Sequence, residues 1–325
     1  MPAFNAVGSV GSAIRSLQGQ SLADLEIVLV DDGSTDGTAM AMAGHASGDR
    51  RIRLAKLAEN RGVAAAMNHC VALARGEFVA RMDADDISHP ERLERQVAHL
   101  EANPDVSVCA TGIRVVGGGE GYAKFEIWIN ALQSHEAMAR ERFIETPVIN
   151  PSAMIRRSAW DAMGGVRDLP WAEDYDLWLR LFAGGFRFAK LPEILLDWRD
   201  SPGRLTRRDS RYSHQAFLMA KAHHLARVPG LLERGVRVCG AGPIGKRVAR
   251  LLQARAVRVA AFYEVNPRRI GQTIAGAPVL DQRGLPPAGA EVLIGAIGRA
   301  GARPLMRQLA AEGGYVEGDD FWLLA

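Results

Sequence analysis

The chain has 325 residues, of which 48% are hydrophobic and 24% are charged, and its formal net charge is +3. This composition is typical of a globular protein with a sizeable core, which excludes global disorder, and the length predicts about two domains. The net charge is too small to indicate a nucleic-acid-binding protein. We interpret the densest basic stretch, around Arg204, Arg207, Arg208 and Arg211, as a solvated loop rather than a membrane or phosphate patch.

Three scattered cysteines, Cys70, Cys109 and Cys239, lack the spacing of metal ligands. Their number and spacing favour a reducing compartment over a disulfide framework. No apolar run approaches the roughly 18 residues needed to cross a bilayer, and the first residues lack a signal-peptide pattern. We therefore expect a cytoplasmic protein that at most touches the inner face of a membrane.

The first half of the chain alternates apolar runs with helical patterns, which predicts strands crossed by helices in an α/β fold. Glu26–Val30 and Glu77–Met82 are expected strands, and residues 63–74 between them an expected helix. Asp31-Asp32 follows the first strand, and an acidic run at 83–86 follows the second. Because open α/β sheets bind ligands at the carboxyl ends of their strands, these acids are expected to lie beside a ligand.

Farther along, the spacing of Ser88 and Glu91 predicts a capping box with Pro90 in the first helical turn. Leu93, Val97 and Leu100 then follow at i, i+4 and i+7, the pattern of a core-facing helix. Glycine-rich residues 117–121 are predicted as a loop. The remaining expected elements before the C-terminal unit are a segment at 151–157, a helix at 174–182, a hairpin or strand at 186–198 and a helix at 213–226.

A second unit is predicted after Pro229-Gly230, with strands beginning near 236, 257 and 292. Gly240, Gly242 and Gly245 lie between the first of these strands and a helix, as in a dinucleotide-binding turn, and Glu264 stands where a ribose-binding acid is expected. About 90 residues cannot hold a complete site of this kind. Helix packing and phosphate binding remain equal explanations for the glycines.

Asp83, Asp85 and Asp86 place three carboxylates within four residues. They repel one another unless a cation or hydrogen-bond donors compensate them. Mg²⁺ and similar hard ions bind carboxylates together with substrate phosphates, so the run is a candidate metal site. An exposed acidic turn explains the same residues equally well.

Two further acidic groups have both a chemical and a structural explanation. Asp31 and Asp32 could accept hydrogen bonds from a nucleobase and a ribose, or simply belong to a strand-to-helix turn capped by Ser34 or Asp36. Glu173 and Asp174 could supply a general base, or simply favour a helix N-terminus.

Taken together, these motifs resemble family 2 glycosyltransferases, a group of inverting enzymes with the GT-A fold. The resemblance covers about residues 2–208 and rests on segments in the family's order, which are PAFN at 2–5, EIVLVDDGSTD at 26–36, ENRG at 59–62, ARGEF at 74–78, MDADD at 82–86, EDYDLWLR at 173–180 and WR at 198–199. It implies a mostly parallel GT-A domain at 1–210, a helical linker at 211–232 and a small Rossmann-like α/β domain at 233–325.

The resemblance also implies roles for single residues. It implies Asp174 as the general base with Glu173 beside it, and Asp85 with Asp83 as ligands of Mn²⁺ or Mg²⁺. Nucleotide-sugar contacts are implied for Pro2, Phe4, Asp31, Asp32, Arg61, Asp83 and Arg199. The implied reaction is transfer from a nucleotide-diphosphate sugar, by default a UDP-sugar, to a glycan or lipid-linked acceptor of the cell surface.

Two positions depart from the family pattern. Members usually have an apolar strand before the position of Pro2, whereas this sequence begins at Met1. We expect the sheet to lack that strand, either because the start codon is assigned too late or because the protein is a variant with weaker donor binding. Asn150 stands where many members have a histidine, on the acceptor side.

Two other functions remain as alternatives. An NAD(P)-dependent oxidoreductase could be built around the glycine-rich turn, although it would leave the acidic motifs unexplained. A non-catalytic nucleotide-sugar-binding protein would keep the acids and lack turnover.

Overall fold

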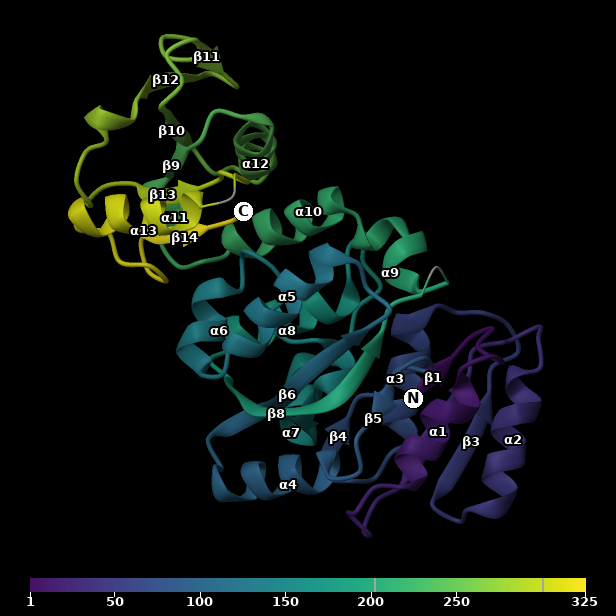
Figure 1. Cartoon of the computed structure of the whole chain (residues 1–325). Helices are drawn as coiled ribbons and strands as arrows, with labels where there is room; N and C mark the ends of the chain where they lie inside the picture. The colour runs from purple at the N-terminus through teal and green to yellow at the C-terminus, as the bar shows by residue number, and fades with distance from the viewer. Residues whose placement is uncertain (202, 300) are drawn as a thin grey trace. The chain divides into compact units, whose positions relative to one another are not determined.

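The computed structural model describes residues 1–201, 203–299 and 301–325, and these form two compact units (Figure 1). The first unit comprises Met1–Met138, Pro147–Leu169 and Glu173–Arg208. The second comprises Ala139–Thr146, Pro170–Ala172 and Asp209–Ala325. The segment that we expected to be a linker, 211–232, thus belongs to the second unit, where its long helix α10 (His214–Leu225) packs on α12 (Pro243–Gln253).

The strands of the first unit are short at the start of the chain and long toward its end. They are β1 (Pro2–Ala3), β2 (Ile27–Asp31), β3 (Ile52–Lys56), β4 (Phe78–Ala80), β5 (Ile87–Ser88), β6 (Val106–Val116), β7 (Met154–Arg156) and β8 (Arg187–Arg199).

Helices separate most of these strands. They are α1 (Val10–Gln18), α2 (Thr38–Gly48), α3 (Val63–Leu73), α4 (Arg92–Ala102), α5 (Glu120–Ala131), α7 (Arg157–Met163), α8 (Glu173–Ala183) and α9 (Leu205–Arg208). A 3₁₀ turn covers Asn150–Ser152. Helix α6 (His135–Glu141) begins in the first unit and ends in the second.

The first unit contains two sheets. The first is parallel, with the order β1-β2-β3. Pro2 and Ala3, which we expected to follow a missing strand, themselves form β1 and pair with Val30 and Asp31. The Met1 ammonium is buried and donates a hydrogen bond to the Val28 carbonyl at 2.7 Å, and burial lowers its pKa.

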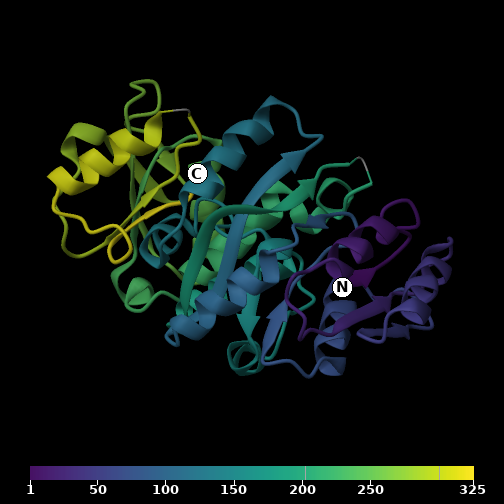
Figure 2. The same ribbon diagram turned by 60° about the horizontal axis from the view of Figure 1, so that its bottom comes forward.

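The second sheet has the order β4-β7-β6-β8-β5, and only its β6–β8 pair is parallel. These two strands run side by side over their whole length (Figure 2). The expectation of a mostly parallel sheet is therefore correct for β1–β3 and wrong for the second sheet, since β4 and β5 pair antiparallel with β7 and β8. The two acidic turns follow strands of different sheets.

Apolar side chains from both sheets build the interior of this unit. One cluster joins Met1 and α1 to Leu29, Met82 and Trp198. A second gathers the α8 residues Leu177, Trp178 and Leu181 with β6 and β7. Because α8 is buried along most of its length, the position of Asp174 at its first turn is fixed by the core.

The second unit is built on a mostly parallel sheet with the order β11-β12-β10-β9-β13-β14, in which only β11 is antiparallel. Its strands are β9 (Val236–Cys239), β10 (Val259–Glu264), β11 (Thr273–Ile274), β12 (Ala277–Asp281), β13 (Val292–Gly295) and β14 (Phe321–Leu323). Its other elements are α10, α11 (Leu231–Arg234), α12, α13 (Ala302–Glu312) and 3₁₀ turns at Ser210–Tyr212 and Gln282–Gly284.

Two local predictions were wrong. The capping box does not form, because Ser88 lies in β5 and binds the Gln20 amide, and α4 starts only at Arg92 without a side-chain cap. The glycine-rich loop leads directly into α5, which we did not predict. Among the described residues, no helix combines the length and the apolarity required to span a bilayer.

Candidate active site

The turn after β2 places Asp32 beside the start of α3. The Asp32 carboxylate accepts hydrogen bonds from the backbone N–H groups of Arg61 at 2.9 Å and Gly62 at 3.0 Å. Burial raises the pKa of Asp32 above its ordinary value, although these two donors oppose the shift. Asp31 is fully buried, and its Oδ2 atom has no hydrogen-bond partner among the described residues. This turn therefore presents acceptor atoms that a ligand with N–H or O–H groups could satisfy.

Gly33 is required at this turn for two reasons. Its φ of +71° lies in the left-handed region, and a Cβ atom there would lie 2.4 Å from the carbonyl carbon of Glu59. A side chain at this position would push the turn away from the Glu59–Asn60 backbone. That backbone continues into the N–H groups of Arg61 and Gly62, which donate to Asp32.

The residues after β1 are bound to the same turn. The Asn5 N–H donates to Ser34 Oγ at 3.0 Å, and the Asn5 side-chain oxygen accepts from the Thr35 N–H at 2.9 Å. Phe4 is 46% exposed beside them, while Pro2 is buried in β1. The structure thus brings Pro2, Phe4, Asp31 and Asp32 together at one end of the parallel sheet.

The acidic run at 83–86 forms a compact cluster. One carboxylate oxygen each from Asp83, Asp85 and Asp86 lies within 4.8 Å of the others. The Asp83 and Asp85 side chains are each 29% exposed, whereas Asp86 is fully buried. Burial raises the pKa of Asp85 to about 7 and also raises that of Asp86, and the neighbouring carboxylates add to both shifts. A cluster of this kind is stabilised by positive charge.

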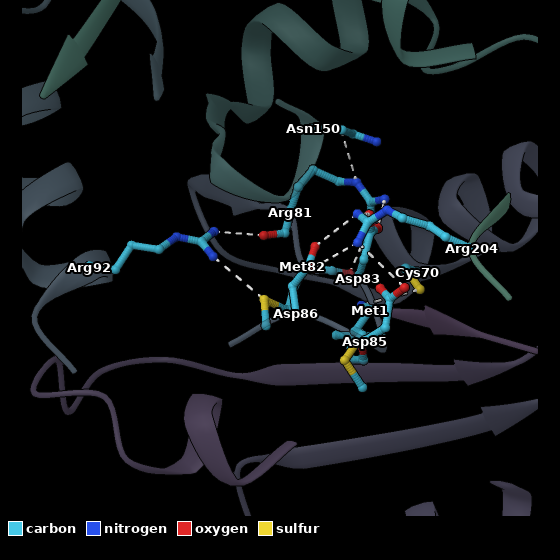
Figure 3. Close-up of polar contacts among 11 residues, drawn as sticks. Met1, Cys70, Arg81, Met82, Asp83, Asp85, Asp86, Arg92, Asn150 and Arg204 are labelled. Carbon is cyan, nitrogen blue, oxygen red and sulfur yellow. Dashed lines mark hydrogen bonds and ion pairs between the residues drawn. The ribbon is translucent and has the colours of Figure 1, made fainter. Parts of the chain in front are cut away.

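Arg204 supplies part of that charge (Figure 3). Its guanidinium binds Asp86 in a bidentate manner, at 2.9 and 3.1 Å, and lies 3.5 Å from both Asp83 and Asp85. It also donates to the Arg199 carbonyl at 2.6 Å and stacks 4.4 Å from the centroid of the Trp198 ring. Arg204 is only 6% exposed, so our interpretation of this residue as part of a solvated loop was wrong.

The contacts divide the acidic cluster by role. Asp86 accepts from both Nη atoms of Arg204 and from the Arg199 N–H at 2.8 Å, so its acceptor capacity is largely used. Asp83 and Asp85 touch Arg204 only at 3.5 Å and remain partly exposed. Oxygen ligands with spare capacity fit a hard divalent ion such as Mn²⁺ or Mg²⁺, and Asp83 and Asp85 are the residues that fit it.

Arg81 was not predicted as a site residue, although it is an arginine inside a predicted strand. It is 3% exposed, donates to Asp83 at 3.0 Å and to the Asn150 side-chain oxygen at 3.3 Å (Figure 3). Its placement links Asn150 to the acidic cluster. A buried charge within an apolar strand was the signal that could have identified it.

Asp174 belongs to the same electrostatic neighbourhood. Burial raises the pKa of Asp174 to about 8, the charge of Glu173 adds to the shift, and Asp83 and Arg81 also act on it, in opposite directions. Its Oδ1 atom accepts a hydrogen bond from the Tyr175 N–H at 2.7 Å. A carboxylate with a pKa near neutrality is suited to act as a general base.

The two predicted arginines approach this region in different ways. Arg61 contacts Asp32 through its backbone N–H, and the residue itself is exposed. Arg199 contacts Asp86 through its backbone, while its guanidinium lies 3.4 Å from Ser12 Oγ on α1. Gly240, Gly242, Gly245 and Glu264 lie in the second unit and form a separate group.

Comparison with known proteins gives the class and the family. The family model described as glycosyl transferase family 2 matches residues 1–164. EpsE of Bacillus subtilis, named a putative glycosyltransferase, is 35% identical over 70% of this chain and 82% of its own length. AmsE of Erwinia amylovora, named an amylovoran biosynthesis glycosyltransferase, is 30% identical over 57% of this chain and 68% of its own.

A solved structure shares the fold. The crystal structure of S. aureus TarS 1–349 with UDP-GlcNAc aligns over 78% of this chain and 70% of its own, with a TM-score of 0.58 and 17% identity. The fold and the matches define the protein as a glycosyltransferase of the GT-A type. The chain belongs to glycosyl transferase family 2.

Proposed function

We propose that the protein is an inverting, metal-assisted glycosyltransferase that moves a sugar from a UDP-sugar to an acceptor hydroxyl. The observation that supports this most directly is the cluster of Asp83, Asp85 and Asp86, in which two carboxylates retain spare acceptor capacity. Family membership favours glycosyl transfer over the alternative of an NAD(P)-dependent oxidoreductase.

The donor nucleotide would bind at the end of the parallel sheet. Asp32 and the Oδ2 atom of Asp31, which has no partner within the described part of the chain, would accept hydrogen bonds from the base and the ribose. Pro2 and Phe4 would line the same site, and Arg61 would approach the nucleotide, since its exposed side chain begins beside Asp32. The default choice of UDP agrees with the UDP-GlcNAc named for TarS.

Asp83 and Asp85 would hold the metal ion. Arg204 lies beside both, and Arg199 contacts the neighbouring Asp86 through its backbone. When bound there, Mn²⁺ or Mg²⁺ would neutralise negative charge on the diphosphate leaving group.

Asp174, with Glu173 beside it, would act as the general base. Its carboxylate takes the proton of the acceptor hydroxyl while the hydroxyl oxygen attacks the anomeric carbon. The bond from that carbon to the diphosphate oxygen breaks, and the diphosphate leaves with the electron pair. A single displacement inverts the configuration, through a transition state of oxocarbenium character.

The acceptor would be a cell-surface glycan or its lipid-linked precursor. Support comes from the name of AmsE, which refers to amylovoran biosynthesis. Asn150, held by Arg81 beside Asp83, is the residue that we assign to the acceptor side.

A thermal-shift screen tests donor binding. UDP, UDP-GlcNAc and GDP-mannose are added with Mn²⁺, with Mg²⁺ or with EDTA. A ligand at 100 times its dissociation constant stabilises the folded state by about 2.7 kcal/mol. We expect UDP and UDP-GlcNAc to raise the melting temperature only with a divalent ion, and no response to any nucleotide would contradict the proposal.

Release of UDP from the donor then separates an enzyme from a non-catalytic binding protein. The matched pair of variants is Asp174→Asn and Asp168→Asn, since Asp168 is an exposed acid outside the site. Turnover should be lost only in the first. Metal-dependent binding without any turnover of the wild-type protein, across donors and glycan acceptors, would favour the non-catalytic alternative.

A further inference from the structure

The second unit contains a cavity of about 350 Å³ at the beginning of α12. Its size is within the range of small-ligand sites, roughly 300–1,000 Å³. The lining residues come from the turn after β9, from α12 and from the turn after β10. They are Ala241, Gly242, Pro243, Lys246, Arg247, Arg250 and Arg269.

The lining is strongly cationic and contains no acid. Lys246, Arg247 and Arg250 come from successive turns of α12, with Lys246 and Arg250 at i and i+4. Within the described part of the chain, none of these three forms an ion pair or a side-chain hydrogen bond. Like charges at this spacing repel each other and destabilise a helix. A bound anion would relieve the repulsion between Lys246 and Arg250.

Glu264, the acid that we expected to bind a ribose, is already occupied. It accepts hydrogen bonds from the N–H groups of Ala241, Val265 and Asn266 and from Arg269 Nη1, at 2.9–3.1 Å. Its carboxylate therefore positions Arg269 at the cavity and has little capacity left for sugar hydroxyls. This arrangement favours a ligand recognised by its negative charge.

The glycines divide between packing and access. A Cβ atom at Gly245 would lie 1.8 Å from the Gly240 carbonyl oxygen, so Gly245 is required for the contact of α12 with the turn before it. Gly242 precedes the helix, and Pro243 occupies its first turn. The backbone N–H groups of that turn add partial positive charge at the cavity.

The charge of Arg247 also acts on His214, at the start of α10. Burial lowers the pKa of His214 below the ordinary value, Lys221 and Arg247 lower it further, and Glu145 opposes the shift. Glu264 offsets the charge of Arg269, whereas among the described residues no carboxylate forms an ion pair with Lys246, Arg247 or Arg250.

We propose that this cavity binds the diphosphate group of a small soluble phosphate ester. Four cationic side chains and a helix N-terminus can surround a group that carries two or more negative charges, whereas the cavity offers no acid for a sugar or a base. The site lies wholly within the second unit, so it does not depend on the function proposed for the first.

Isothermal titration calorimetry on the full chain tests the proposal, with inorganic pyrophosphate as the probe and EDTA present. EDTA removes divalent ions, without which the acidic cluster of the first unit repels a diphosphate. The variant is Arg247→Gln/Arg250→Gln, because both residues are exposed. The control is Arg268→Gln/Arg283→Gln, which removes the same charge from exposed positions of the same unit outside the cavity.

Pyrophosphate should bind the wild-type chain and the control equally, and the cavity variant at least about tenfold more weakly. UDP and NADP⁺ serve as further arms, since tighter binding of either that the cavity variant weakens identifies a nucleoside diphosphate or a dinucleotide as the source of the group. If the double variant does not fold, Lys246→Gln replaces it. The proposal is overturned if none of the three ligands binds at millimolar concentration, or if both double variants weaken binding equally.

Discussion

The position of Arg204 leads to a prediction about stability. Replacing Arg204 by Met keeps much of the stacking volume on Trp198 but removes the charge from the acidic cluster. Asp86 is fully buried and would lose both of its guanidinium donors. Leaving one partner of a buried ion pair uncompensated costs about 3–5 kcal/mol.

The expected change in melting temperature follows from that free energy. For a folding unit of 150–250 residues, 1 kcal/mol corresponds to roughly 2–4 °C, so a loss of about 3 kcal/mol lowers the melting temperature by roughly 6–12 °C. A divalent ion can replace the missing charge, so Mn²⁺ should restore part of the loss in the Arg204→Met variant. Mn²⁺ should raise the melting temperature of the wild-type protein less, because Arg204 competes with the ion for the same carboxylates.

Differential scanning fluorimetry in EDTA and in millimolar Mn²⁺ measures both effects. Arg95→Met is the control, because Arg95 on α4 and its partner Glu91, just before α4, are 55% and 58% exposed, and exposed pairs contribute only about 0–1 kcal/mol. Equal destabilisation by the two substitutions, or an equal response of Arg204→Met and wild type to Mn²⁺, would refute the reasoning.

Four further predictions concern the first unit. Asp174→Asn should abolish turnover in a UDP-release assay while the dissociation constant for UDP with Mn²⁺ stays unchanged; normal turnover would remove Asp174 from its role. Because Asp174 acts when ionised, kcat/KM should rise as pH increases from 6, with a midpoint at or below about 8, and a flat profile would contradict this. Asp85→Asn should weaken Mn²⁺-dependent UDP binding more than about tenfold by calorimetry. A titration of UDP in EDTA gives the metal-independent binding, which the substitution should leave unchanged. Gly33→Ala should lower the free energy of unfolding in urea by more than about 1 kcal/mol, since its φ is +71° and the added Cβ meets the Glu59 backbone; an unchanged midpoint would exclude strain at the turn.

Local patterns predicted many elements of both units. The helices at 63–73 and 173–183 and the strands at 27–31, 236–239 and 292–295 were expected within a few residues. The stripe of Leu93, Val97 and Leu100 packs in the core as predicted. These elements have apolar periodicities that depend only on neighbouring residues, so sequence alone could identify them.

Strand pairing was harder to predict, because it depends on residues far apart in the chain. The segment at 77–82 has the pattern of a strand, but nothing local indicates that β4 pairs antiparallel with β7. Phe78 pairs with Arg156, which lies 78 residues later in the chain. The missed helix α5 follows three glycines, which locally favour a loop.

The sequence by itself determined the family, the acidic residues and the type of chemistry, because motif order and residue type are local properties. Only the tertiary structure decided how the acids are compensated. Arg204 binds Asp86 from 118 residues away in the chain, and Arg269 donates a hydrogen bond to Glu264 in the second unit. Charge compensation depends on distance in space and on burial, and neither can be obtained from the spacing of residues along the chain.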